Sequence, residues 1–199
     1  MIISNKVVGG DDVVFDLGSN SGAISVVLAA LCRQGGHVHA FDPYPWNACA
    51  TRYNCLLNGL DNVSAHAVGL SDRDYEIMVS PNDSRIFAES GADEAQKLLI
   101  HDFRRYSHLS PRFLKLDIEG SEHDLFLNKD KSVFSSVKCF VLEFHPFFIR
   151  PRGIDPKDSL RSIEESGFSL HYHNPAAPRF NVETHTDNLH LFWGLKADG

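Results

Sequence analysis

Two acidic side chains and a histidine follow apolar segments of the sequence, in positions where they could move a proton. Asp117 and Glu119 lie at one strand-to-helix turn, and His145 ends a second apolar segment. A carboxylate or an imidazole can accept the proton of a hydroxyl group that it contacts, which is general base catalysis. We therefore expect Asp117, Glu119 and His145 to be catalytic candidates. Because alternate residues of a strand point to opposite faces, only one of the two acids is expected to contact a substrate.

Neighbouring acids suggest two other roles. Glu122 lies in the first turn of the predicted helix, where a negative charge stabilises the helix dipole, and we interpret it in that way. Asp117, Glu143 and His145 could instead supply a site for a hard cation. Their positions do not form a compact ligand motif, so we expect no metal site and metal-independent chemistry.

A glycine-containing turn separates an apolar segment from a helical pattern near the start of the sequence. Its glycines are Gly18 and Gly22, without the middle glycine that the dinucleotide fingerprint G-x-G-x-x-G requires, so an NAD-binding loop is disfavoured. Asp16 lies just before this turn, and Asp42 lies where the next apolar segment ends. This pattern fits S-adenosylmethionine, because a carboxylate at Asp42 can accept hydrogen bonds from both ribose hydroxyls.

The elements that must position these residues alternate between short apolar strands and amphipathic helices. Such alternation predicts an α/β fold with a parallel sheet, right-handed crossovers and a ligand at the carboxyl ends of the strands. The predicted strands are residues 13–17, 37–41, 63–68, 113–118, 137–144, 168–173 and 189–195. The predicted helices are residues 23–32, 46–57, 121–127 and 156–165.

The segment between residues 71 and 111 is less regular. Residues 75–79 could form an extra strand, and residues 81–91 are typical of a loop. We predict a helix over residues 95–106 that carries Leu98, Leu99 and Phe103 inward.

Length and composition limit the architecture and the partners. A chain of 199 residues with 43% apolar residues is long enough for one α/β domain, residues 1–199. A net charge of −7 argues against a nucleic-acid groove as the main surface. No segment has the length of a membrane span, and the first residues lack the pattern of a signal peptide, so we expect a cytoplasmic protein with no membrane partner.

Four sequence blocks, taken in this order and spacing, resemble the FkbM family of S-adenosylmethionine-dependent methyltransferases. They read VFDLGSNSG at residues 14–22, AFDP at 40–43, GLSD at 69–72 and LKLDIEGSE at 114–122. The resemblance extends over about residues 13–146. The terminal strand pair follows at about residues 168–196. It implies a Rossmann-like class I methyltransferase fold, with seven mostly parallel strands, one antiparallel strand and helices on both faces.

The resemblance also implies roles for individual residues. Those around the glycine turn line the methionine portion of S-adenosylmethionine, those after the second strand hold the ribose, and those after the third pack near the adenine. The implied cofactor-binding residues are Asp16, Gly18, Ser19, Asn20, Gly22, Asp42, Pro43, Val68 and Gly69.

Asp117 would face the methyl group that is transferred. The activity implied is usually O-methylation of a hydroxyl, so the expected partner is a small-molecule or sugar acceptor and not a nucleic acid. A non-catalytic cofactor-binding module, or one domain of a larger protein, remains the alternative. An NAD-linked oxidoreductase is disfavoured by the glycine spacing, and nucleic-acid methylation by the charge and by the lack of an Asn-Pro-Pro-Tyr-like block after Leu116.

Overall fold

Seven strands form a central sheet in the computed structural model, which describes residues 7–79, 96–127, 129–183 and 191–196. The order is β3-β2-β1-β7-β8-β10-β9, and every neighbouring pair is parallel except the two that include β10. The predicted fold class and its single antiparallel strand are therefore confirmed. The strands are β1 Val13–Leu17, β2 His37–Phe41, β3 Val63–His66, β7 Phe113–Leu116, β8 Cys139–Glu143, β9 Phe168–Tyr172 and β10 Leu191–Lys196.

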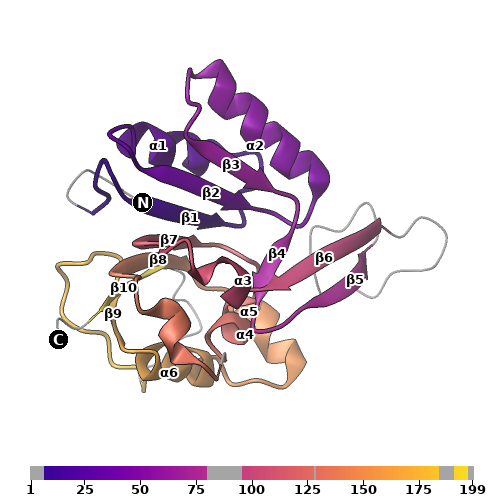
Figure 1. Ribbon diagram of the computed structural model, residues 1–199. Coiled ribbons are helices and arrows are strands. Elements are labelled where there is room, and N and C mark those ends of the chain that lie inside the picture. Colours follow the sequence, from indigo (N-terminus) through magenta and orange to yellow (C-terminus); the bar gives the residue numbers. More distant parts are fainter. Residues whose placement is uncertain (1–6, 80–95, 128, 184–190, 197–199) are drawn as a thin grey trace.

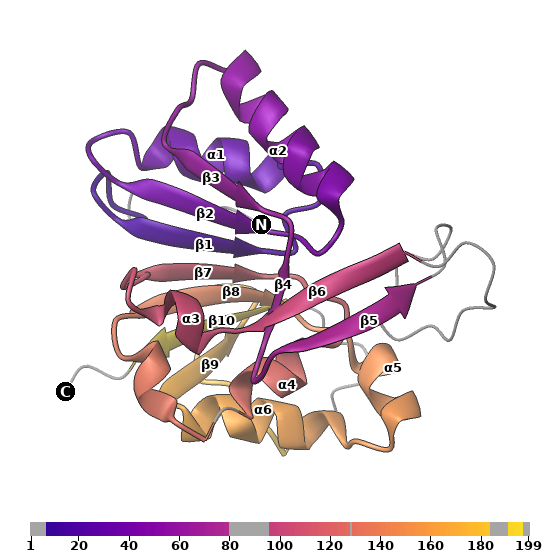
Figure 2. The same cartoon turned by 45° about the vertical axis from the view of Figure 1, so that its right-hand side comes forward.

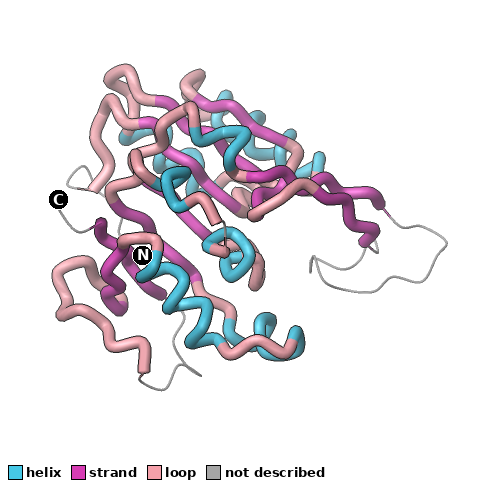
Figure 3. Tube along the Cα trace, turned by 60° about the horizontal axis from the view of Figure 1, so that its bottom comes forward, coloured by secondary structure: helices cyan, strands magenta, loops and turns pink. Residues whose placement is uncertain are grey.

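Both faces of this sheet are buried, because successive side chains of each strand enter different cores. Val14 packs into one apolar cluster and Phe15 into the other. Helices α1 and α2 cover one face, and α4 and α6 cover the other, so that the strands lie between two helical layers (Figure 1, Figure 3). Their bounds are α1 Ala23–Leu31, α2 Pro45–Leu57, α4 Glu122–Phe126 and α6 Pro156–Glu165.

Shorter helices connect these elements. They are α3 Arg104–Ser107, α5 Pro146–Ile149 and the 3-10 helices η1 Lys131–Phe134 and η2 Arg150–Arg152. Within the described ranges, no helix combines the length and apolar character needed to cross a bilayer.

A second, three-stranded sheet lies beside the carboxyl ends of the central strands (Figure 2). It consists of β4 Gly69–Ser71, β5 Tyr75–Val79 and β6 Gln96–Asp102 in the order β4-β6-β5. The extra strand predicted at residues 75–79 is confirmed. The loop predicted at residues 81–91 lies outside the described residues.

The helix predicted over residues 95–106 is wrong, because most of this segment is strand β6 and only α3 is helical. Burial alternates along β6: Leu98 is 1% exposed and Ile100 3%, whereas Leu99 between them is 38% exposed. Two adjacent leucines fit the stripe of a helix, but pairing with β4 and β5 satisfies the backbone of β6 and turns Leu99 away from the core.

The turns that follow the neighbouring strands β1 and β7 approach each other very closely. Gly18 begins the turn after β1 with a φ of 74°, and a Cβ atom there would overlap with the carbonyl oxygen of Asp117. A glycine is required at this position both for its left-handed backbone and for the absence of a side chain.

Replacement of the two adjacent leucines of β6 tests its strand character. Leu98→Ala should lower the free energy of unfolding by about 2–5 kcal/mol, the usual cost of removing a buried leucine. Leu99→Ala should cost clearly less, because that side chain is partly exposed. Urea unfolding of both variants measures the difference, and equal losses would favour a helix with both leucines buried.

Replacement of Gly18 tests the close approach of the two turns. Gly153 is a matched control, because its φ is also 74° but a Cβ there would meet nothing within 4 Å. Gly153→Ala should cost only the left-handed strain, about 1–2 kcal/mol. Gly18→Ala should cost more, because the Asp117 turn must also move. The same unfolding cost for both variants would contradict the crowding at Gly18.

Candidate active site

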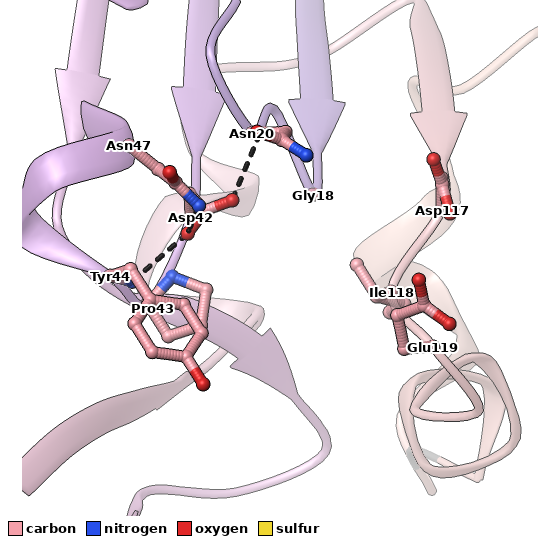
Figure 4. A pocket seen from close by; sticks show the side chains of 9 residues that line it. All are labelled: Gly18, Asn20, Asp42, Pro43, Tyr44, Asn47, Asp117, Ile118 and Glu119. Atoms are coloured by element: carbon pink, nitrogen blue, oxygen red, sulfur yellow. Dashed lines mark hydrogen bonds between the residues drawn. The ribbon is translucent and has the colours of Figure 1, made fainter. Parts of the chain in front are cut away.

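An open pocket lies at the carboxyl ends of β1, β2 and β7, where parallel α/β sheets usually bind their ligands. Two walls face each other across it: one follows β1 and β2, the other follows β7 (Figure 4). The first wall contains Gly18, Asn20, Asp42, Pro43, Tyr44 and Asn47. The second wall contains Asp117, Ile118 and Glu119.

Asp42 is the structural centre of the first wall. Its Oδ2 accepts a hydrogen bond from the backbone of Asn20 (2.9 Å), and its Oδ1 accepts from the backbone of Tyr44 (2.9 Å) and from the side chain of Asn47 (3.0 Å). Burial raises the pKa of Asp42, and these three hydrogen bonds and Lys115 oppose that rise. The carboxylate therefore joins the glycine turn to the start of α2, in addition to lining the pocket.

A smaller, mostly apolar pocket adjoins the first and shares Gly18, Pro43 and Ile118 with it. Gly69 lines this second pocket, where a side chain would meet Ile100. Val68, which the sequence assigned to the same region, packs into the apolar core and lines neither pocket.

Other residues assigned to cofactor binding lie behind the pocket rather than in its lining. Asp16 is fully buried, and its Oδ2 accepts a hydrogen bond of 2.6 Å from the hydroxyl of Ser25. Ser19 is also buried, and Gly22 packs against Thr51 at the start of α1. The carboxylate of Asp16 therefore contacts Ser25 and Lys115 and does not line the pocket, and its assignment to the methionine portion stays a prediction.

Lys115 is an important residue that the sequence reasoning missed. Its ammonium is buried, donates a hydrogen bond of 2.7 Å to the carbonyl of Gly18, and lies 3.3 Å from Asp16 Oδ1 and 3.4 Å from Asp117 Oδ2. A lysine in the middle of a four-residue apolar strand, FLKL, was a signal that could have identified it.

The second wall brings both acids of the β7 turn to one side, contrary to the prediction that they diverge. Strand β7 ends at Leu116, and Glu119 takes a left-handed conformation with a φ of 53°. The strand rule therefore no longer applies at these positions. Asp117 Oδ1 and Glu119 Oε2 lie 3.8 and 3.7 Å from His145 Nε2, so the three predicted catalytic residues are adjacent.

Glu122 supports this group from inside the protein. It lies in the first turn of α4 as predicted, but it is only 1% exposed, and its Oε1 lies 3.2 Å from both the backbone nitrogen of Ile118 and His145 Nδ1. Glu122 therefore does more than stabilise the dipole of α4, because it also contacts His145 and the turn after β7.

The electrostatic environment changes the protonation of the pocket residues. Burial alone would lower the pKa of His145, but the Glu122 hydrogen bond and the negative charges of Glu122, Glu119 and Asp117 raise it. Burial raises the pKa of Glu119, and the neighbouring carboxylates add to this effect, whereas His145 opposes it. The second wall thus combines proton-accepting groups with a histidine that Glu122 holds in place.

The fold resembles several solved structures, at sequence identities that support the architecture alone. A proposed rRNA methylase from Clostridium thermocellum has a TM-score of 0.56 and 12% identity, covering 99% of this chain and 100% of that one. A proposed methyltransferase from Streptococcus mutans in complex with SAH has a TM-score of 0.55 and 12% identity, with the same coverage. Precorrin-6y C5,15-methyltransferase from Geobacter metallireducens has a TM-score of 0.52 and 14% identity, covering 94% of this chain and 81% of that one.

These names include different acceptors, among them rRNA, so they do not support the predicted exclusion of nucleic acid. A comparison with curated proteins gave no match. The model of the methyltransferase FkbM domain, in contrast, matches residues 16–170, which is most of the chain. The chain therefore belongs to the FkbM methyltransferase family.

Proposed function

We propose that the protein transfers a methyl group from S-adenosylmethionine to a hydroxyl oxygen of a small molecule or a sugar. The observation that carries this proposal is the pocket with two different walls: a hydrogen-bonded wall around Asp42 faces a wall that holds Asp117 and Glu119 beside His145. The first wall suits a nucleoside, and the second suits the deprotonation of an acceptor.

The first wall and the adjoining apolar pocket fit the parts of S-adenosylmethionine. The carboxylate of Asp42 is a suitable acceptor for the ribose hydroxyls. The smaller pocket, lined by Gly69, Leu70 and Ile100, offers an apolar surface beside the ribose side, which suits contact with a flat ring such as adenine. The turn at Gly18 lets the backbone approach the methionine portion.

The second wall would position the acceptor and remove its proton. When bound, S-adenosylmethionine supplies a methyl group on a positively charged sulfur. Asp117 and Glu119 hold the acceptor hydroxyl in line with that group, which is the main requirement of a displacement reaction. A carboxylate of Asp117 or Glu119 would accept the hydroxyl proton as the acceptor oxygen bonds to the methyl carbon, and the sulfur would keep the electron pair of the broken carbon–sulfur bond. His145, which Glu122 orients, lies beside the two acids.

A non-catalytic module that only binds the cofactor is the second candidate, because the first wall would serve it equally well. Product formation distinguishes such a module from an enzyme. The module would bind S-adenosylhomocysteine (SAH) but would form none from S-adenosylmethionine when acceptors are present.

Calorimetry with SAH and NAD tests the first wall. SAH should bind and NAD should not, because the glycine turn lacks the dinucleotide spacing. Asp42→Ala should weaken SAH binding by about 1.5–3 kcal/mol, the range for hydrogen bonds to a charged group. Asp61→Ala, which changes an exposed acid, is the control and should have no effect.

Because Asp42 also holds the glycine turn, a ligand change separates its two roles. An SAH analogue without ribose hydroxyls should bind the wild type and Asp42→Ala alike. If the variant loses as much affinity for this analogue as for SAH, Asp42 organises the turn and does not bind the ribose. NAD affinity similar to that of SAH would contradict the cofactor assignment.

Methyl transfer from S-adenosylmethionine, labelled in its methyl group, to a panel of sugars, small hydroxylated molecules and RNA tests the second wall. Asp117→Asn should reduce the rate by about a hundred- to ten-thousand-fold, the usual contribution of a general base. SAH affinity should change little, because Asp42 and the apolar pocket are intact. Transfer to RNA alone would replace the proposed acceptor class, and an unchanged rate in the variant would remove Asp117 from the reaction.

A further inference from the structure

We propose that Asp117, Glu143 and His145 bind a divalent transition-metal ion at the edge of the pocket. One oxygen of each carboxylate and one imidazole nitrogen all lie within 4.8 Å of one another. They come from two neighbouring strands: Asp117 follows β7, Glu143 ends β8, and His145 follows it. The parallel pairing of β7 with β8 therefore creates a ligand set that is not contiguous in the sequence.

The contacts of His145 Nε2 with the two acids are longer than hydrogen bonds. His145 Nε2 lies 3.8 Å from Asp117 Oδ1 and 3.9 Å from Glu143 Oε1, beyond hydrogen-bond length. Two ligand atoms bound about 2.1 Å from one ion are about 3.0–3.4 Å apart, so ligand atoms that lie within 4.8 Å of one another must move inward on binding. The side chains of Asp117 and Glu143, which are 31% and 56% exposed, have room to make that movement.

The other nitrogen of His145 is already fixed by a buried carboxylate. His145 Nδ1 lies 3.2 Å from Oε1 of Glu122, whose side chain is fully buried. This contact orients the ring so that Nε2 faces Asp117 and Glu143. Metal-binding histidines are usually oriented by a carboxylate in this way.

The charge of the group also favours a cation. Glu119 Oε2 lies 3.7 Å from the same nitrogen, so three carboxylates surround one face of the imidazole. Among the residues that the structure describes, Lys115 is the one lysine or arginine within ion-pair distance of this group, through Asp117. A divalent ion would offset the remaining negative charge.

The ligand types indicate the class of ion. One imidazole with two carboxylates suits Mn²⁺, Fe²⁺ or Zn²⁺ better than Ca²⁺ or Mg²⁺, which prefer oxygen ligands alone. If methyl transfer occurs as proposed above, and this part of the inference rests on that function, the ion would stabilise the acceptor oxygen as it loses its proton. The sequence predicted no metal site because the spacing of these residues does not show that the ends of β7 and β8 lie side by side.

Titration of the full chain with Mn²⁺ tests the site without any acceptor. Bound Mn²⁺ is measured from the decrease of the free-ion signal in electron paramagnetic resonance. The wild type should bind one Mn²⁺. Glu143→Gln should weaken binding at least about tenfold by removing a ligand, and Glu122→Gln by about 10–100-fold by releasing His145. Glu76→Gln, at an exposed acid on β5, is the control and should bind as the wild type does.

Absence of Mn²⁺ binding at millimolar concentration would overturn the proposal. Equal Mn²⁺ affinity in the wild type and Glu143→Gln, or the same loss of affinity in Glu76→Gln as in Glu143→Gln, would also overturn it.

SAH calorimetry on the same samples distinguishes failure of the metal site from failure of the proposed function. SAH binding without Mn²⁺ binding removes only the metal site, and Mn²⁺ binding without SAH binding removes only the cofactor assignment. Weaker S-adenosylmethionine binding in Glu143→Gln, without Mn²⁺ binding in the wild type, would assign the acids to the sulfonium charge instead.

Discussion

The ammonium group of Lys115 lies buried between the carboxylates of Asp16 and Asp117 and donates a hydrogen bond to the carbonyl of Gly18. A buried charge is costly unless it is paired and hydrogen-bonded, and here both conditions are met. These contacts join the end of β1 to the end of β7, the strands that supply the two walls of the pocket. Lys115 therefore links the two walls of the pocket. The crowding of Gly18 against the Asp117 carbonyl joins the same walls through the backbone.

The two walls use acids in different ways. Asp42 has its oxygens committed to backbone and side-chain donors, so its charge is satisfied by the protein. At and beside the second wall, Glu119 and Glu143 have no lysine or arginine partner among the described residues, and they lie near His145 Nε2. An acid without such a partner attracts a proton or a cation more strongly than one whose charge the protein satisfies. The two sides of the pocket therefore differ in how their acids are compensated.

The central sheet could be predicted from the sequence because its strands are short apolar runs separated by clear turn signals, as at Gly18 and at Gly35-Gly36. Strand β6 could not, since Leu98 and Leu99 fit a helix until β4 and β5 are present as neighbours. At the site, Asp42, Asp117 and His145 were found because each follows a recognisable strand. Glu122 was read as a helix-dipole partner because its burial depends on how α4 packs. Contacts between residues on different strands cannot be read from the spacing of residues in the sequence.

Strand β10 has a consequence for the order in which the site can form. It pairs Leu191 with Glu143 and thereby gives β8 its second neighbour, from a segment far along the chain. Strands β1, β2 and β3 pair with one another through local crossovers and can assemble early during synthesis. Strand β8 gains its second neighbour only after β10 has been made and has inserted between β8 and β9. A ribosome-bound chain would therefore pair the strands behind the first wall before the strand that carries Glu143 has both of its neighbours.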